Sequence, residues 1–158
     1  MADKASSTRL DHVGIIVEDL EKAVDYAQSL GIGPFKALQN LVREDTQLYG
    51  KPVEPADIKL RVKMADIGGG ARLELIQPLG RGPWQDFLET KGNGIHHRAF
   101  VADDVTREGA KLLEQGATVL YSVRFQGGGG SIYLETSKFG GIVNVIEFVS
   151  WPPLDVNI

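Results

Sequence analysis

Hydrophobic and polar positions along this chain follow first a strand pattern and then a helix pattern. Residues Leu10–Val17 are apolar at nearly every position, which is typical of a strand buried on both faces. Asp19 offers a helix N-cap and Gly31 a stop signal, so we expect a short amphipathic helix between them. Its expected buried positions are Leu20, Val24, Ala27 and Leu30. Three further apolar or alternating runs predict strands at Phe35–Leu41, Ile58–Ala65 and Ala71–Gln77.

The same order of elements begins again after a connection that contains Gly and Pro. This linker, residues 78–94, is expected to hold one or two helical turns after Pro83. Gly94–Val101 predicts a strand, and Asp103–Gly116 predicts a helix. The apolar positions expected to face inward on that helix are Val105, Leu112 and Leu113. Three more strands are expected at Thr118–Val123, Ser131–Glu135 and Ile142–Val149.

Counting along the chain indicates that the two halves repeat one unit. An offset of 85 residues relates His12 to His97 and also relates Asp19 to Asp104. At the end of each half, the segments LELIQP and IEFVSWP align at an offset of 73, so the second half has shorter loops. Two β-α-β-β-β modules in tandem explain this pattern better than one irregular domain does.

Composition limits the chemistry that is available. The 158 residues are enough for a core, and the absence of Cys excludes disulfides and thiolate metal sites. The net charge of −4 argues against a large nucleic-acid surface. No signal peptide or membrane-spanning run is visible, so we expect a cytoplasmic protein with neither membrane nor nucleic-acid partners. Residues 1–8 are expected to be a disordered tail and residues 151–158 a C-terminal tail. The runs Gly68–Gly70 and Gly127–Gly130 fit hairpin connections better than phosphate-binding loops.

Each half carries one His in its first strand and one Glu in its last. These residues are His12 and Glu74 in the first half, and His97 and Glu147 in the second. If the halves pair about a pseudo-two-fold axis, the four side chains converge. Two neutral imidazoles and two carboxylates have a charge of −2, which balances a divalent ion with octahedral preference. Two adjacent coordination positions then remain for a substrate that carries neighbouring oxygens.

These segments resemble the vicinal oxygen chelate superfamily, which includes glyoxalase I, methylmalonyl-CoA epimerase, extradiol dioxygenases and bleomycin-resistance proteins. The resemblance covers roughly residues 10–149 and is closest to the epimerase and glyoxalase-like branch. The matching segments are LDHVGIIVEDLEKAV, RLELIQPLG and GIHHRAFVADDV. The resemblance implies that His12, Glu74 and His97 are metal ligands, whereas His96 points to the opposite face.

The fold implied is α+β, with two tandem β-α-β-β-β modules that form a curved, partly open barrel-like sheet around a metal site. Module one is residues 9–77 and module two residues 95–150, within a single domain of residues 9–150. Such modules often pair across subunits, so a homodimer is expected.

The identity of the fourth ligand stays open at this point. In epimerase-like proteins a Gly-Gly pair precedes the strand, and the ligand Glu comes four residues after the second Gly. That count from Gly141 reaches Val145, whereas a count from Gly140 reaches Asn144. We favour Glu147, because IEF in the second half mirrors LEL in the first. Asn144 in its place would remove a charge and the family's catalytic base.

The function that the resemblance implies is a metal-dependent isomerase or epimerase that acts through an enolate of a vicinal-oxygen substrate. An acyl-CoA thioester with an adjacent carboxylate fits that description. Glu147 or Glu44 is the expected proton carrier, and the cofactor is a divalent ion (Zn, Ni, Co, Mn, Mg or Fe). One alternative is a glyoxalase I-like lyase that acts on a hemithioacetal. Another is a small-molecule-binding protein of the resistance type, against which the set of ligands argues.

Overall fold

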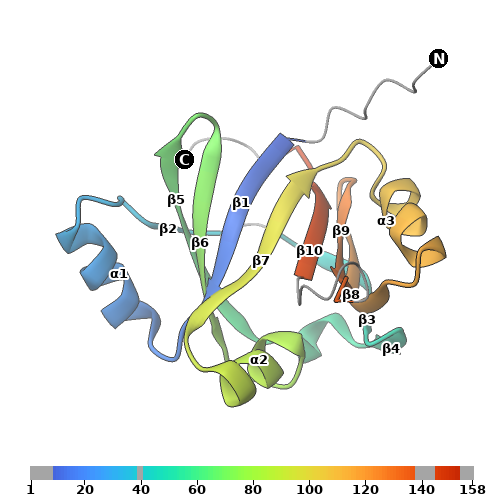
Figure 1. The fold of residues 1–158 in the computed structure, drawn as a ribbon, viewed down its shortest axis with the longest axis horizontal. Coiled ribbons are helices and arrows are strands. Elements are labelled where there is room, and N and C mark those ends of the chain that lie inside the picture. The colour runs from blue at the N-terminus through green and yellow to red at the C-terminus, as the bar shows by residue number, and fades with distance from the viewer. Residues whose placement is uncertain (1–8, 39–40, 138–144, 154–158) are drawn as a thin grey trace. The chain divides into compact units, whose positions relative to one another are not determined.

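The computed structural model describes residues 9–38, 41–137 and 145–153, and it confirms the α+β class. By their contacts, the residues form two compact units (Figure 1). Of the described residues, the N-terminal unit contains 11–38 and 56–98, and the C-terminal unit contains 9–10, 41–55, 99–137 and 145–153. Within the described ranges, no helix is long and apolar enough to cross a membrane.

The N-terminal unit has a sheet in the order β2-β5-β6-β1-β7. Strand β1 runs parallel to β6, and β5 runs antiparallel to β2 and β6. Helix α1 packs on β5 and β6, and helix α2 packs on β6. The buried core under α1 includes Leu20 and Leu75, and each such side chain contributes about 1.5–3 kcal/mol. The elements are β1 (Arg9–Ile16), α1 (Leu20–Ser29), β2 (Lys36–Ala37), η1 (Pro55–Asp57), β5 (Leu60–Gly68), β6 (Ala71–Pro78), α2 (Pro83–Lys91) and β7 (Gly94–Val101).

The C-terminal unit has a sheet in the order β10-β9-β8-β3-β4, and the last residues of β7 lie beside β10. The four pairs from β10 to β4 are antiparallel. Helix α3 packs on β9 and β10. The expected start of the last strand, at residues 142–144, lies outside the described residues. The elements are β3 (Arg43–Leu48), β4 (Lys51–Val53), α3 (Val105–Glu114), β8 (Thr118–Phe125), β9 (Gly130–Glu135) and β10 (Val145–Ser150).

The internal repeat is visible in both topology and backbone hydrogen bonds. The order β2-β5-β6-β1 has its counterpart in β8-β9-β10-β7. The N–H of Val17 donates to the carbonyl of Ile76 at 2.9 Å, and the N–H of Ala102 donates to the carbonyl of Val149 at 3.0 Å. These two pairs are related by the offsets of 85 and 73 that were counted along the sequence. The two β-α-β-β-β modules are therefore confirmed as repeats of one fold.

The first helix of each repeat begins in the same way. The carboxylate of Asp19 accepts a hydrogen bond from the backbone N–H of Lys22, and Asp104 accepts one from Arg107. A side-chain cap of this kind satisfies one of the backbone donors that a helix leaves unpaired at its start. The expected N-cap at Asp19 is thus confirmed, and the equivalent residue caps α3.

The sequence pattern does not reveal the β3–β4 hairpin, which occupies the polar stretch REDTQLYGKPVEPAD between two of the expected strands. Among the described residues of the strand expected at Phe35–Leu41, only the two residues of β2 are in a strand, and residues 39 and 40 lie outside the described residues. The hairpin turns at Tyr49 and Gly50, whose φ values of 49° and 76° match a two-residue turn of type I′. Along β3 only Thr46 and Leu48 are buried, and Thr46 is polar. The strand therefore lacks the alternation of apolar and polar residues by which a strand is predicted from sequence.

Two helix positions that were expected to face inward are exposed. Helix α1 ends at Ser29, so Leu30 lies at its C-cap and is 61% exposed. On α3, Leu113 is 40% exposed, and the buried positions are Glu108 and Gly109 instead. A Cβ at Gly109 would lie 3.1 Å from the side chain of Ile132 on β9. The small residue therefore allows α3 to lie close to β9 at Gly109.

Substituting Gly129 is expected to destabilise the protein more than substituting its neighbour Gly128. Both residues lie in the β8–β9 hairpin at positive φ, 78° and 115° respectively. A Cβ on Gly129 would overlap the carbonyl of Ser150, whereas Gly128 faces open space. We expect Gly128→Ala to lower the free energy of unfolding by about 1 kcal/mol and Gly129→Ala by about 3 kcal/mol, as measured by urea denaturation. Equal losses would contradict the role of the overlap.

Candidate metal centre

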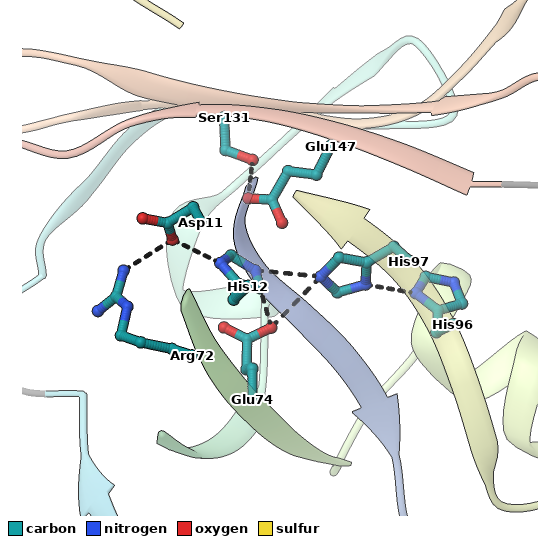
Figure 2. Close-up of polar contacts among 8 residues, drawn as sticks. All are labelled: Asp11, His12, Arg72, Glu74, His96, His97, Ser131 and Glu147. Carbon is teal, nitrogen blue, oxygen red and sulfur yellow. Dashed lines mark hydrogen bonds and ion pairs between the residues drawn. The ribbon is translucent and has the colours of Figure 1, made fainter. Parts of the chain in front are cut away.

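Three of the predicted metal ligands come together in the N-terminal unit (Figure 2). His12 lies on β1, Glu74 on β6 and His97 on β7, and β1 is the strand between the other two. The two imidazoles are fully buried, and Glu74 is 5% exposed. Polar side chains that are buried in this way need hydrogen-bond partners, an opposite charge or a bound metal ion.

One atom from each of these side chains forms a nearly equilateral triangle. The Nε2 atoms of His12 and His97 are 3.3 Å apart, and Oε1 of Glu74 lies 3.5 Å and 3.4 Å from them. A point at the centre is about 2 Å from each corner, which is the length of a zinc bond to an imidazole or carboxylate. Oε1 of Glu74 is buried and, among the described residues, has no hydrogen-bond partner. The donor set therefore fits a divalent cation.

The outer nitrogen of His12 is fixed by a carboxylate. Nδ1 of His12 lies 2.7 Å from Oδ2 of Asp11, and a guanidinium nitrogen of Arg72 donates to the same oxygen at 2.7 Å (Figure 2). Burial of Asp11 favours its neutral form, but the hydrogen bond from His12 and the charge of Arg72 outweigh this and lower the pKa of the Asp11 carboxyl. With a proton on Nδ1, a neutral His12 presents the lone pair of Nε2 to the triangle.

His97 reaches the triangle because the residue opposite it has no side chain. Its imidazole lies over Gly14, where a Cβ would overlap three ring atoms. On its other side, Nδ1 of His97 is 2.9 Å from Nδ1 of His96, which is also buried. The ring of His96 in turn meets the edge of Phe87 on α2, with centroids 5.0 Å apart. The imidazole of His97 is therefore confined on both sides.

Glu147 lies in the C-terminal unit, at the place in the repeat that corresponds to Glu74. Each of the two stands two residues before the carbonyl of the repeated backbone bond described above. Glu147 is 3% exposed, and its Oε1 accepts a hydrogen bond from the hydroxyl of Ser131 at 2.7 Å. The alternative, Asn144, lies outside the described residues. The assignment of Glu147 as a ligand stays a prediction. Its position, which is equivalent to that of Glu74 in the repeat, supports this prediction.

A buried polar cluster beside Glu147 was missed by sequence reasoning. Tyr133 is the register partner of Glu147, and Tyr121 is the register partner of Tyr133. The two tyrosine rings meet edge to face, and Arg43 donates to the hydroxyl of Tyr121 at 3.2 Å. Burial raises the pKa of Tyr121 to about 12; Arg43 opposes this shift and the Glu147 carboxylate adds to it. Successive side chains of a strand point to opposite faces of the sheet, and this alternation along β8 and β9 is the sequence signal that could have placed the two tyrosines on one face.

Glu44 has surroundings unlike those of the buried carboxylates. It lies on β3 of the C-terminal unit, opposite Arg124 on β8. Its carboxylate is 3.6 Å from the guanidinium of Arg124, which also pairs with Asp45. The Glu44 side chain is 42% exposed, so the pair contributes less than about 1 kcal/mol. A catalytic role for Glu44 stays a prediction.

Replacing Gly14 is expected to weaken metal binding through His97. A Cβ at this position must displace the His97 ring from the triangle, so we expect Gly14→Ala to reduce zinc affinity at least about tenfold, measured by calorimetric titration. Gly94→Ala is the matched control on β7, because its Cβ would meet only Phe87, at 3.9 Å. Unchanged affinity in Gly14→Ala would show that His97 does not contribute to the site.

The raised pKa of Tyr121 predicts a stability change in alkali. The folded value of about 12 exceeds the ordinary value of 10.0, so folding favours the neutral phenol. This contribution to stability is complete below pH 10.0 and is lost as the pH rises toward 12. We expect the free energy of unfolding of the wild type to fall more steeply over that range than that of Tyr121→Phe. Ultraviolet titration of the two proteins should differ by one phenolate that appears near pH 12, and a difference centred at pH 10 would contradict the prediction.

Known proteins resemble this chain over nearly its whole length. An ethylmalonyl-CoA/methylmalonyl-CoA epimerase of Cereibacter sphaeroides is 31% identical over 147 residues, which cover 89% of this chain and 98% of that protein. A solved methylmalonyl-CoA epimerase in complex with methylmalonyl-CoA and NH4+ superposes with a TM-score of 0.64 at 27% identity, covering 90% of this chain and 93% of that one.

Methylmalonyl-CoA epimerase from Mycobacterium tuberculosis has the same fold, with a TM-score of 0.65 at 24% identity over 97% of this chain and 94% of that one. The family model of the glyoxalase/bleomycin resistance protein/dioxygenase superfamily matches residues 11–134. The repeated modules, the His and Glu positions and this match lead to one conclusion: the chain belongs to the glyoxalase/bleomycin resistance protein/dioxygenase superfamily.

Proposed function

We propose that this protein is a metal-dependent epimerase that acts through an enolate, with a methylmalonyl-CoA-like thioester as its substrate. The observation that carries the proposal is the triangle formed by His12, Glu74 and His97, with a buried Glu74 oxygen that lacks a hydrogen bond. The similarity to proteins named methylmalonyl-CoA epimerase supports the choice of substrate. In such a substrate one carbon lies between a thioester carbonyl and a carboxylate, so two oxygens are placed for chelation.

His12, Glu74 and His97 would hold the ion, and further coordination positions would serve the two substrate oxygens. A bound divalent ion supplies positive charge that favours loss of the proton from the carbon between the chelated groups. Asp11 keeps the Nε2 lone pair of His12 directed to the centre. Burial of all three ligands excludes water, and this strengthens the electrostatic interactions of the site.

Glu147 is the residue that we assign to proton transfer and to the fourth ligand position. Its equivalence to Glu74 in the repeat and its burial support the assignment. Ser131 holds one carboxylate oxygen and thereby sets the direction of the other. A carboxylate held in this way is prepared to accept a proton without a change of rotamer.

Inversion requires that a proton leave one face of the carbon and return to the other, so a second proton carrier is needed. We assign this role to Glu44. Its partly exposed side chain can exchange a proton with solvent, which a carrier on the return face must do. A glyoxalase-like reaction on a hemithioacetal would use the same ligands, and the experiment below separates the two reactions.

Metal content and proton exchange together test the proposal. Protein purified without added metal is expected to bind one equivalent of a divalent ion after loading, and the double variant His12→Ala/His97→Ala is expected to bind none. In D2O the loaded wild type should exchange the α-proton of methylmalonyl-CoA and should not turn over the hemithioacetal of methylglyoxal and glutathione. We expect Glu147→Gln and Glu44→Gln each to lower exchange by about 10²–10⁴-fold, the usual contribution of a general acid or base.

Glu114→Gln is the matched control, because Glu114 is an exposed residue at the end of α3. It should retain wild-type exchange. A wild-type protein that binds no divalent ion under any loading condition would refute the proposal. Metal binding with hemithioacetal turnover in place of exchange would assign the lyase reaction instead.

A further inference from the structure

The two buried imidazoles of the triangle are supported by different partners. Nδ1 of His12 bonds to the Asp11 carboxylate, which Arg72 balances with its positive charge. Nδ1 of His97 instead lies 2.9 Å from Nδ1 of another histidine, His96 (Figure 2). A short contact between two imidazole nitrogens requires that one of them carry a proton and the other accept it.

The direction of this hydrogen bond decides whether His97 can be a ligand. If His96 donates, a neutral His97 carries its proton on Nε2, which then serves the 3.3 Å contact with Nε2 of His12 and occupies the place of a cation. If His97 donates, its Nε2 has a lone pair and faces the centre of the triangle. His96 must then be the Nε2–H tautomer, with Nδ1 as the acceptor.

We propose that His96 is a positioning residue that accepts the Nδ1–H of His97 and so favours the tautomer in which Nε2 of His97 can bind a cation. This inference rests on the proposed metal-dependent function, which it deepens. A neutral acceptor orients His97 without adding a buried negative charge. On the other side of the site, Asp11 introduces such a charge and Arg72 offsets it.

The surroundings of His96 suit a fixed acceptor. The side chain is buried, at 6% exposure, between β7 and the α2 helix. The ring of Phe87 on α2 meets the His96 ring at 77°, and the rings of His96 and His97 meet at 88°. Packing on two sides limits rotation of the His96 ring, so its Nδ1 stays within hydrogen-bonding distance of His97.

The tautomers can be measured directly in the protein loaded with zinc. The chain has only three His, so long-range ¹⁵N–¹H spectra of ¹⁵N-histidine-labelled protein resolve every ring, and single variants assign them. At about pH 8, above the ordinary histidine pKa, we expect protons on Nδ1 of His12 and His97 and on Nε2 of His96. In the loaded protein, a proton on Nδ1 of His96 or on Nε2 of His97 would overturn the proposal.

Metal affinity tests the consequence of this hydrogen bond. His96→Phe fills the site but removes the acceptor, so we expect zinc or cobalt affinity about 10–100-fold below that of the wild type, measured by calorimetry and by the cobalt absorption spectrum. His96→Asn retains an oxygen acceptor near the position of Nδ1 and is expected to restore most of the affinity. Phe87→Leu is the matched control, because it alters the packing of His96 while keeping the acceptor.

The outcomes separate this proposal from the proposed function. If the wild type and His96→Phe bind metal equally well, the positioning role is refuted and the metal-dependent function stands. If the wild type binds no metal, the proposed function and the positioning role that rests on it are both refuted. Equal losses in Phe87→Leu and His96→Phe, without rescue by His96→Asn, would reduce His96 to a packing role and would also refute the proposal.

Discussion

The arrangement of the N-terminal unit depends on one constraint: two imidazole nitrogens and one carboxylate oxygen face one another in a buried core. Their separations of 3.3–3.5 Å leave Oε1 of Glu74 without a hydrogen bond. Burying such a group without compensation costs several kcal/mol. A cation at the centre would remove that cost, because each of the three atoms can then act as a ligand.

The sheet determines that these atoms meet. β1 lies between β6 and β7, and its parallel register with β6 places Gly14 beside Glu74. Gly14 also leaves the space that the His97 ring occupies. The site thus depends on the absence of a side chain as much as on the three that are present. At the equivalent place in the second repeat stands Ala99, so the two repeats are not interchangeable.

The supports behind the ligands show the same asymmetry. His12 is held by the charged pair of Asp11 and Arg72, whereas His97 contacts His96, whose own ring packs against Phe87. A repeat supplies equivalent backbone positions, but each module has its own neighbours around the ligand side chains. Duplication of a β-α-β-β-β unit therefore gives a symmetric frame in which each metal ligand can be tuned separately.

The sequence by itself determined the repeat, the helix caps and the three residues that meet. Each depends on local spacing or on a count along the chain: the offsets of 85 and 73 reappear in the backbone bonds that start at Val17 and Ala102. The β3–β4 hairpin, the exposure of Leu113 and the tyrosines beside Glu147 were decided only by the tertiary structure. The reason is physical. Strands that are distant in sequence decide which face of an element is buried, and they also decide which nitrogen of an imidazole has a partner.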